Sequence, residues 1–466
     1  MRNYLSDRKQ RVVLNGSSSS YYPIESGVPQ GSVLGPLLFL IYINDLEKDI
    51  KSKIKFFADD SMLFSIVHDP ATTAAELKHN LDIITKWAHQ WKMSFNPEPT
   101  KQAIEVLFST RRTKVNHPPL FFNNSLILKK GSHKHLGLIL DSKLAFTIHI
   151  NEKIEIAKKF IGVLKYLSNY LPHKTLNQMY KIFVRPHLDY ADIIYHIPHI
   201  QNAFDSSISL HPLMERIEQI QYQAALAITG CWRGSSRQKL YEELGWESLS
   251  DRRWSRRLIH IYKIRNNMTP QYLRDNLPMQ RGGYLRNSVP TKYHEISCNS
   301  TRYMNSFFPD SVKSWNIIGV DFCSTNSIAI FKKNIINLIR PVVKSHFGIH
   351  DPIGLKILYQ LRVGLSPLKC HKKQHNFVDT PNDWCDCRCA PENSTHYLIS
   401  CDLYALPRLT LRSTVLNILQ RNNLQNLLEE IEIYLYGHPS LSFVDNKNIL
   451  LSTITFFKES KRFSNF

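Results

Sequence analysis

The sequence lacks an apolar run of the roughly 18 to 20 residues that a membrane-spanning helix requires. Its longest apolar run, from Val33 to Ile43, contains Gly35 and Pro36. The charged first residues, Met1 to Arg11, have no apolar centre and so do not match a secretory signal peptide. The sequence therefore gives no indication of membrane insertion or export.

Acidic residues are scarce relative to basic ones. The 466 residues include 59 lysines and arginines but only 39 aspartates and glutamates, a formal net charge of +20 that is spread along the chain. This excess favours a polyanionic partner such as a nucleic acid, although an anionic membrane surface could also use it. Because 43% of the residues are hydrophobic, we expect about two to four globular domains and not a disordered chain.

Two adjacent aspartates, Asp59 and Asp60, lie between apolar residues in the segment Lys55 to Phe64. This pattern predicts a strand, a two-residue turn and a second strand, with both carboxylates at the tip of the hairpin. Adjacent carboxylates repel each other unless a cation lies between them, and Mg²⁺ binds one or two carboxylates together with substrate phosphates. The alternative is ordinary turn chemistry, since aspartate tolerates turn dihedrals.

A segment rich in glycine and proline, Ser26 to Phe39, precedes the aspartates. Its glycines allow the backbone to approach a ligand closely, and Gln30 can offer a hydrogen-bond donor and an acceptor there. An apolar run from Leu37 to Ile43 then predicts a helix that ends at Asn44. The alternative is a plain turn that leads into a buried helix.

These segments together resemble the palm of reverse transcriptases from non-LTR (LINE-type) retrotransposons. The resemblance rests on three motifs in the family's order and spacing: Gly-Val-Pro-Gln-Gly-Ser-Val-Leu-Gly-Pro-Leu-Leu-Phe from Gly27, Tyr-Ile-Asn-Asp-Leu from Tyr42, and Phe-Ala-Asp-Asp from Phe57. It implies a right-hand polymerase palm in which Asp59 and Asp60 are catalytic and hold two Mg²⁺ ions.

The resemblance also implies substrates and further site residues. The substrates would be an RNA template, a DNA primer and deoxynucleoside triphosphates, and the target would be genomic DNA. The protein would act in the nucleus or the cytoplasm. Gln30 and Gly31 would lie beside the template and the incoming nucleotide. Lys101 resembles the family's lysine near the triphosphate, for which a lone surface lysine is the alternative, and Gly137 resembles a glycine of the primer grip.

One expected carboxylate is missing from the sequence. Such a palm uses two divalent ions about 4 Å apart, normally held by three carboxylates, and the third should precede Gly27 by several dozen residues. Only 26 residues precede Gly27, and Asp7 lies in a stretch that resembles the segment after the motif of the third carboxylate. We therefore expect an N-terminally truncated chain that lacks the fingers, the first catalytic aspartate and any endonuclease domain. Such a chain would be inactive or nearly inactive by itself. The alternative is a non-catalytic nucleic-acid-binding protein.

After residue 146 the hydrophobic period becomes helical. Ile150, Ile154 and Ala157 begin one apolar stripe, and further helices are expected at Pro172 to Val184 and Leu213 to Thr229. An amphipathic helix then carries clustered arginines beside a tryptophan, which suits phosphates and a stacked base. The alternative is a solvated basic face with a core tryptophan. The candidate nucleic-acid-binding residues are Arg252, Arg253, Arg256 and Arg257.

Three of the eight cysteines are crowded into Cys385-x-Cys387-x-Cys389, and His396 and Cys401 follow. In a chain without an export signal, such crowding points to metal before disulfides. The spacing of His396 and Cys401 is that of zinc knuckles, but three cysteines compete for two places. Reduced cysteines without metal are the alternative, and any zinc could be purely structural.

The family resemblance extends to this C-terminal segment, because many of these elements end in a comparable Cys-x-Cys, His-x₄-Cys pattern followed by a tyrosine and an arginine, here Tyr404 and Arg408. It favours a zinc site from which Cys389 is excluded. The implied ligands are Cys385, Cys387, His396 and Cys401.

We therefore predict an α+β fold with four parts. Residues 1–145 would form a partial polymerase palm, an antiparallel sheet with packed helices, and residues 146–277 an α-helical thumb with a basic helical connector. Residues 278–353 would form an irregular linker and a helix. Residues 354–466 would form a small C-terminal domain with the zinc-knuckle-like Cys/His segment.

Overall fold

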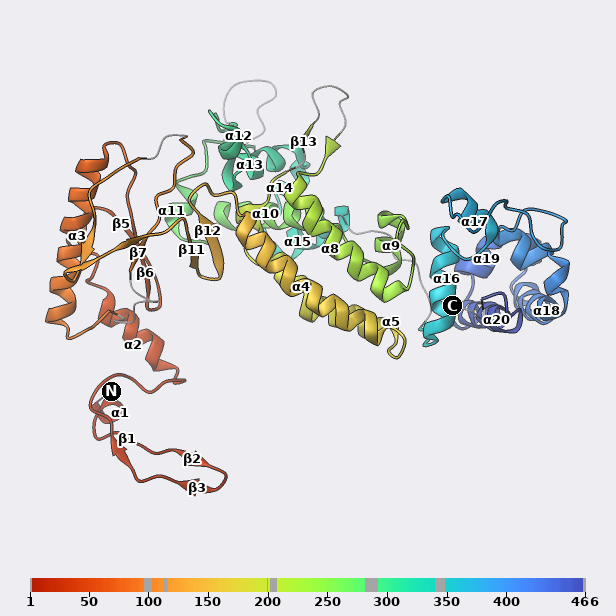
Figure 1. Ribbon diagram of the computed structural model, residues 1–466, viewed down its shortest axis with the longest axis horizontal. Helices are drawn as coiled ribbons and strands as arrows, with labels where there is room; N and C mark the ends of the chain where they lie inside the picture. The colour runs from red at the N-terminus through yellow and green to blue at the C-terminus, as the bar shows by residue number, and fades with distance from the viewer. Residues whose placement is uncertain are drawn as a thin grey trace. The chain divides into compact units, whose positions relative to one another are not determined.

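The computed structural model describes residues 2–95, 103–111, 115–198, 200–201, 208–280, 292–339 and 348–463 (Figure 1). They fall into two compact units, residues 1–145 and 146–466. The first unit mixes short strands with helices, and the second is almost entirely helical. The fold is therefore α+β, and the boundary between the two units follows residue 145.

An exposed β-ribbon opens the first unit after the short helix α1 (Arg2–Leu5). Strands β1 (Lys9–Gln10) and β4 (Tyr22–Pro23) pair with each other, as do β2 (Val13–Leu14) and β3 (Ser17–Ser18). The turn between β2 and β3 has left-handed backbone at Asn15 and Gly16, with φ of 49° and 83°. Both residue types favour that conformation, which explains why the ribbon reverses there.

The predicted acidic hairpin is present and packs on two helices. Strand β5 (Lys53–Phe57) pairs antiparallel with β6 (Asp60–Phe64), and its Ile54 is buried with residues of α2 (Leu34–Ile43) and α3 (Pro70–Gln90). Asp69 caps the start of helix α3, because its carboxylate accepts a hydrogen bond of 2.8 Å from the Thr72 amide. This small core holds the hairpin on the helices.

The other strands of the first unit form separate two-stranded pairs. Strand β8 (Phe121–Phe122) pairs with β9 (Ser125–Leu126), and β7 (Ile104–Glu105) pairs with β10 (Leu128–Lys129) in parallel. Among the described residues no sheet has more than two strands. The prediction of one antiparallel sheet is therefore wrong for this structure.

The chain also reverses between His135 and Leu138. Strand β11 (Ser132–His135) and β12 (Leu138–Asp141) form a hairpin. Leu136 and Gly137 have φ of 46° and 79°, and two consecutive left-handed residues form the tight turn that joins twisted strands.

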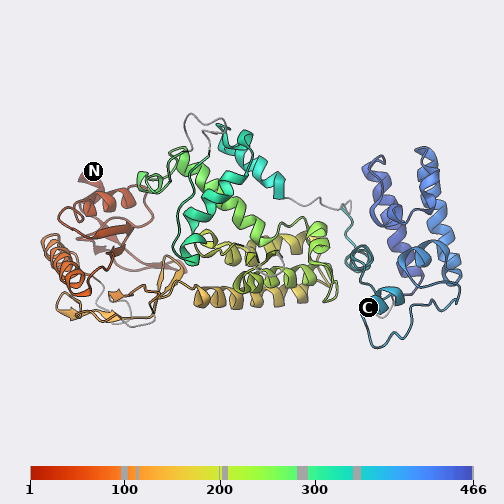
Figure 2. The same ribbon diagram turned by 90° about the horizontal axis from the view of Figure 1, so that it is seen from above.

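The second unit begins with helices where the sequence predicts them. Helix α4 (Thr147–Leu167) buries the predicted stripe and runs beside α8 (Pro212–Thr229), which ends at Gly230 (Figure 2). The helix expected from Pro172 to Val184 is present as α5 and a π-helical turn, η1, and the chain continues into a further helix with Pro186 in its first turn. The elements between α4 and α8 are α5 (His173–Met179), η1 (Tyr180–Val184), α6 (Arg185–Asp189), α7 (Asp192–Tyr195), β13 (Ile200–Gln201) and β14 (Ile208–Ser209).

Helix α10 (Leu249–Arg265) is the centre of a second core. Its Tyr262 ring stacks on Phe331, with centroids 4.4 Å apart, and both pack with Trp315. Residues 292–339 therefore fold against α10. The stretch in which the sequence predicts an irregular linker is packed here, and the helix predicted with it is present as α15. The neighbouring helices are α9 (Arg237–Leu244), α11 (Gln271–Arg274), α12 (Thr301–Met304), α13 (Phe307–Ile317), α14 (Val320–Cys323) and α15 (Ile328–Ile339).

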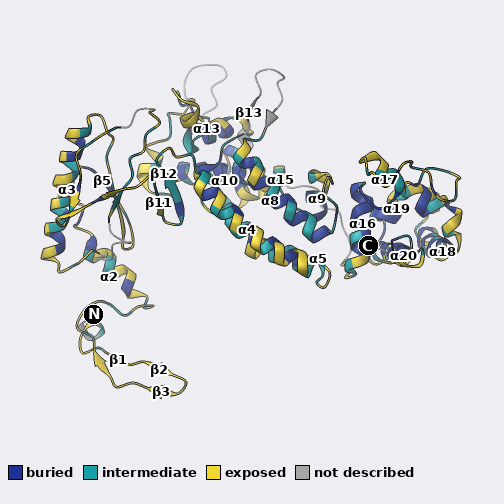
Figure 3. Cartoon of the chain, in the orientation of Figure 1, coloured by how far each residue is buried: buried dark blue, intermediate teal, exposed yellow. Residues whose placement is uncertain are grey.

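The C-terminal helices join the same unit. The Gln360 side chain of α16 (Pro352–Val363) donates a hydrogen bond of 2.9 Å to the Gly230 carbonyl at the end of α8. Helix α16 is largely buried, whereas the β1–β4 ribbon of the first unit is exposed (Figure 3). The described residues after 354 therefore belong to the same compact unit as α4. The remaining elements are α17 (Lys369–Gln374), η2 (His396–Ser400), η3 (Asp402–Tyr404), α18 (Ala405–Arg421), η4 (Gln425–Glu429), α19 (Ile431–Tyr436) and α20 (Phe443–Glu459).

Within the described ranges, no helix is both long enough and apolar enough to span a membrane.

We expect Arg362→Ala to destabilise the second unit. The Arg362 guanidinium on α16 is buried and lies 2.8 Å from the Glu243 carboxylate on α9, and removing one partner of a buried pair costs about 3–5 kcal/mol. The matched control is Arg412→Ala, whose exposed pair with Glu429 contributes about 0–1 kcal/mol. Urea unfolding followed by circular dichroism measures both, and equal midpoints would contradict the expectation.

Candidate functional site

The acidic turn lies one residue earlier than the sequence predicts. Phe57 pairs with Asp60, so the turn consists of Ala58 and Asp59, and Asp60 already belongs to β6. Ala58 has a left-handed φ of 52°, which costs an L-residue roughly 1–2 kcal/mol. Both carboxylates are exposed. The turn therefore presents two adjacent acids to solvent on a strained backbone, where they can bind a hard cation.

Strand β11 contributes to the electrostatic surroundings of Asp60. Burial first, and then the charges of His135 and Lys130, lower the pKa of His133, while the carboxylate of Asp60 acts in the opposite direction. This places the β11–β12 hairpin, with Gly137 in its turn, within electrostatic reach of the acidic turn. The sequence reasoning missed these basic residues, although their crowding just before Gly137 was a visible signal.

The loop before α2 places Gln30 and Gly31 on the surface. Gly31 has a left-handed φ of 78° and open space where a side chain would lie, whereas a side chain on Gly35 would meet the Ser32 hydroxyl at 3.0 Å. The Ser32 hydroxyl donates to the Pro29 carbonyl at 2.7 Å and accepts from the Gly35 amide at 3.1 Å. These bonds fix the loop and leave Gly31 accessible. Lys101 lies outside the described residues.

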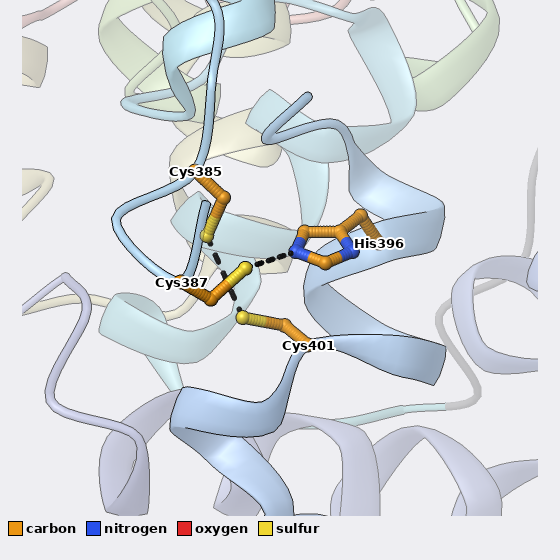
Figure 4. A group of neighbouring side chains, drawn as sticks. All are labelled: Cys385, Cys387, His396 and Cys401. Atoms are coloured by element: carbon orange, nitrogen blue, oxygen red, sulfur yellow. Dashed lines mark hydrogen bonds between the residues drawn. The ribbon is translucent and has the colours of Figure 1, made fainter. Parts of the chain in front are cut away.

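Four potential metal ligands converge in the C-terminal segment (Figure 4). One ligand atom from each of Cys385, Cys387, His396 and Cys401 lies within 4.8 Å of the others. The Cys385 and Cys401 sulfurs are 3.5 Å apart, and the Cys387 sulfur is 3.1 Å from His396 Nε2. Three sulfurs and one imidazole nitrogen at such distances suit tetrahedral zinc, whose bonds are about 2.0–2.3 Å long.

Neighbouring groups orient these ligands. The Nδ1 atom of His396 lies 3.1 Å from the Ser400 hydroxyl, which leaves Nε2 for the cluster. The Arg408 guanidinium donates to the carbonyl of Cys401 and, at 3.1 Å, to that of Leu398. The arginine that follows the cluster in the sequence therefore fixes the backbone that carries Cys401.

The thiols of the cluster differ in their proton affinity. The amide of Cys389 donates to the Cys387 sulfur at 3.4 Å, and this bond is the largest cause that lowers the pKa of Cys387, to about 6. Burial raises the pKa of Cys401 to about 12. Cys389 itself is exposed and does not join the cluster. A cation would have to displace the proton of Cys401, which zinc does on binding.

Elsewhere in the described residues, no group of three or more such ligands lies this close together. Asp59 and Asp60 are therefore not joined by a third described ligand at this spacing.

The arginine cluster of α10 does not face solvent as a nucleic-acid surface. Arg253 and Arg257 are each 1% exposed. The Arg257 guanidinium lies 2.6 Å from the Asp310 carboxylate of α13 and donates to the His196 carbonyl at 2.9 Å. The predicted nucleic-acid-binding role of these two residues is therefore corrected, since their charges are satisfied inside the protein.

The other two arginines are partly exposed but paired. Arg252 and Arg256 both donate to the Asp189 carboxylate at 2.8 Å, and Arg256 also reaches Asp192 at 2.9 Å. The neighbouring Trp254 packs against the core of α10, α13 and α15. The cluster thus forms an internal ion-pair network that neither reading of the sequence anticipated, because the acids that satisfy it lie about 60 residues away in the chain.

Comparisons with known proteins find one matching family profile and several similar polymerases of transposable elements. The profile of the family described as "Reverse transcriptase (RNA-dependent DNA polymerase)" matches residues 1–140. The probable RNA-directed DNA polymerase from transposon X-element of Drosophila melanogaster is 28% identical over 244 residues, 50% of this chain and 25% of the relative. The RNA-directed DNA polymerase from mobile element jockey of Drosophila funebris is 30% identical over 208 residues, 42% of this chain and 22% of the relative. The matched part spans about a quarter of these relatives' length.

We expect the purified chain to contain about one zinc ion, since four ligands complete a structural site. Cys385→Ser should abolish zinc retention. Cys389→Ser is the matched control and should retain it, because the Cys389 thiol lies outside the cluster. Inductively coupled plasma mass spectrometry of protein purified without chelator measures both, and equal zinc loss in the two variants would contradict the assignment.

We expect Arg257→Met to lower stability by about 3–5 kcal/mol, because it leaves Asp310 without its buried partner. The salt dependence of nucleic-acid binding should stay unchanged. The control Arg421→Met, on the exposed last turn of α18, should shift stability by less than about 0.5 kcal/mol. If Arg257→Met instead weakened the salt dependence of nucleic-acid binding and left stability unchanged, Arg257 would be a nucleic-acid contact after all.

Proposed function

Through its residues 1–140 the chain belongs to the reverse transcriptases of non-LTR retrotransposons, and we propose that it serves RNA-directed DNA synthesis by two-metal nucleotidyl transfer. The observation that carries the proposal is the β5–β6 turn, which holds Asp59 and Asp60 side by side and exposed.

The residues around this turn have complementary roles in the proposal. Asp59 and Asp60 would hold Mg²⁺, which when bound activates the primer hydroxyl and neutralises the triphosphate. Gly31 leaves its backbone open for close approach of a nucleotide, and Gln30 beside it offers both a donor and an acceptor. The β11–β12 hairpin places His133 within electrostatic reach of Asp60, so a primer strand near Gly137 would pass close to the two acids.

The C-terminal cluster has a structural role in this proposal. Cys385, Cys387, His396 and Cys401 would hold one zinc ion and thereby fix the segment between α17 and α18. The tight packing of Tyr397 against Phe456 and Phe463 then joins that segment to the end of the chain. An RNA template, a DNA primer and deoxynucleoside triphosphates are the proposed substrates, genomic DNA is the proposed target, and the nucleus is the proposed place of action.

Nucleotide incorporation on a primed RNA template with Mg²⁺ tests the proposal. The double variant Asp59→Asn, Asp60→Asn should lose at least about 100-fold in rate, because several kcal/mol of metal-derived stabilisation disappear. Asp82→Asn, a similar change at an exposed position of α3, is the control and should keep the wild-type rate.

A second candidate function is non-catalytic nucleic-acid binding. It is favoured by the net charge of +20 and by the lack of a third described ligand beside the two aspartates. Equal background incorporation in the wild type and the double variant, together with salt-sensitive RNA binding, would replace polymerisation with this function.

A further inference from the structure

The C-terminal segment contains one thiol more than a four-ligand metal site can use. Cys385, Cys387, His396 and Cys401 supply the four ligand atoms that lie within 4.8 Å of one another. Cys389 is left outside this group, and its side chain is exposed. The proposed function gives the Cys389 thiol no role, although it lies two residues from a ligand.

Three contacts hold Cys389 beside the cluster. Its amide donates to the Cys387 sulfur at 3.4 Å, and its thiol donates to the Cys387 carbonyl, also at 3.4 Å. The Cys389 sulfur lies 3.9 Å from the carboxylate of Asp402, the residue that follows the ligand Cys401. An exposed thiol is therefore fixed against both chain segments that supply the sulfur ligands.

The chain turns tightly between Cys387 and Cys389. The Arg388 amide donates to the Cys385 carbonyl at 2.9 Å, and Arg388 has a left-handed φ of 64°. Residues two positions apart are separated by at most about 7 Å between their Cα atoms when the chain is extended, and a turn shortens that separation. A disulfide needs a Cα separation of about 4.4–6.8 Å, so Cys387 and Cys389 can form one with little movement of the backbone.

Exposure distinguishes Cys387 from the other two sulfur ligands. Cys385 is 3% exposed and Cys401 is fully buried, and their sulfurs lie 3.5 Å from each other. Cys387 is partly exposed. Because the susceptibility of a thiol to oxidation follows its exposure, an oxidant from solvent should reach Cys387 before the buried pair. The exposed Cys389 thiol is then next to the sulfur that is oxidised.

We propose that Cys389 is a resolving thiol: when a peroxide oxidises Cys387, Cys389 captures the oxidised sulfur as a disulfide and prevents its irreversible oxidation. The inference rests on the zinc ligand set of the proposed function, because a disulfide removes the Cys387 thiolate that zinc requires. Oxidation would thereby release zinc from the segment between α17 and α18, and reduction would restore the site.

The reaction consumes one hydrogen peroxide and two thiols. The Cys387 thiolate attacks one peroxide oxygen, so that an S–O bond forms, the O–O bond breaks, and hydroxide leaves and takes up the proton that this thiol has lost. The Cys389 sulfur then attacks the sulfenic acid, so that the S–S bond forms, the S–O bond breaks, and the oxygen leaves as water with the Cys389 proton. Two electrons pass from the sulfurs to the peroxide, which becomes two water molecules. Without the second thiol, Cys387 would continue to sulfinic acid, which thiol reductants do not reverse.

Recovery of zinc after oxidation tests the inference on the full chain. The zinc-loaded protein is treated with hydrogen peroxide beside a chromogenic zinc chelator, and then with dithiothreitol and fresh zinc. Wild-type protein should release its zinc and bind most of it again. Cys389→Ser should begin with the same zinc content, since its thiol is not a ligand, and should recover several-fold less. Cys298→Ser, which removes another accessible cysteine outside the cluster, is the control and should recover like the wild type.

Mass spectrometry of the digested protein supplies a second readout. In wild-type protein the first disulfide should join Cys387 to Cys389, before any disulfide joins Cys385 to Cys401. In Cys389→Ser, Cys387 should instead carry the two added oxygens of a sulfinic acid. The wild-type measurement needs no variant, so it decides the question even if Cys389→Ser misfolds.

Equal zinc recovery by the wild type and Cys389→Ser would overturn the inference, and so would a first disulfide between Cys385 and Cys401. A reduced wild-type chain that holds no zinc would instead overturn the zinc ligand set of the proposed function. A disulfide between Cys387 and Cys389 in that metal-free chain would still support the resolving role of Cys389. The failures of the two proposals are therefore distinguishable, and neither readout depends on nucleotide incorporation.

Discussion

Buried guanidinium groups hold the helices of residues 146–466 in their places. A charge in the protein interior is tolerated only where acceptors surround it. Arg257 on α10 therefore requires Asp310 of α13 and the carbonyls that precede β13, and Arg362 on α16 requires Glu243 of α9. Each such arginine joins segments distant in sequence, so the arrangement of the helices depends on a few specific polar contacts as well as on apolar burial.

The same constraint governs the Cys/His segment. Arg408 binds the carbonyls that lead to Cys401, and Arg462 lies 2.6 Å from the buried Glu392 carboxylate, whose other oxygen accepts from the Lys369 amide at 2.8 Å. The ligands are thus held at metal-binding distance by contacts from outside the motif. Because these arginines are engaged internally, the number of basic residues in the chain overstates what a polyanion can reach, and exposed lysines become the more important contacts.

The first unit depends on backbone conformation more than on charge. Its described strands are short and its two cores are small, but Ala58, Leu136 and Gly137 all take left-handed dihedrals at hairpin turns. These turns set where Asp59, Asp60 and the β11–β12 hairpin lie. Strain of this kind often accompanies functional positions, and here it occurs at the residue that precedes the two acids.

The sequence alone determined the local features. Periodicity located α4 and α8, and the motifs around Gln30 and Asp59 identified the family, because each signal lies within a few consecutive residues. Spacing, together with resemblance, also indicated which four of the Cys/His residues would converge.

Only the tertiary structure decided the partners of the arginines, the packing of residues 292–339 on α10 and the attachment of α16 to α8. In each case the decisive atoms come from segments tens to more than a hundred residues apart. Local patterns report propensity and amphipathicity, and they carry no information about which distant acid, carbonyl or helix will meet a given side chain. The physical reason is that burial and charge pairing are properties of the assembled core.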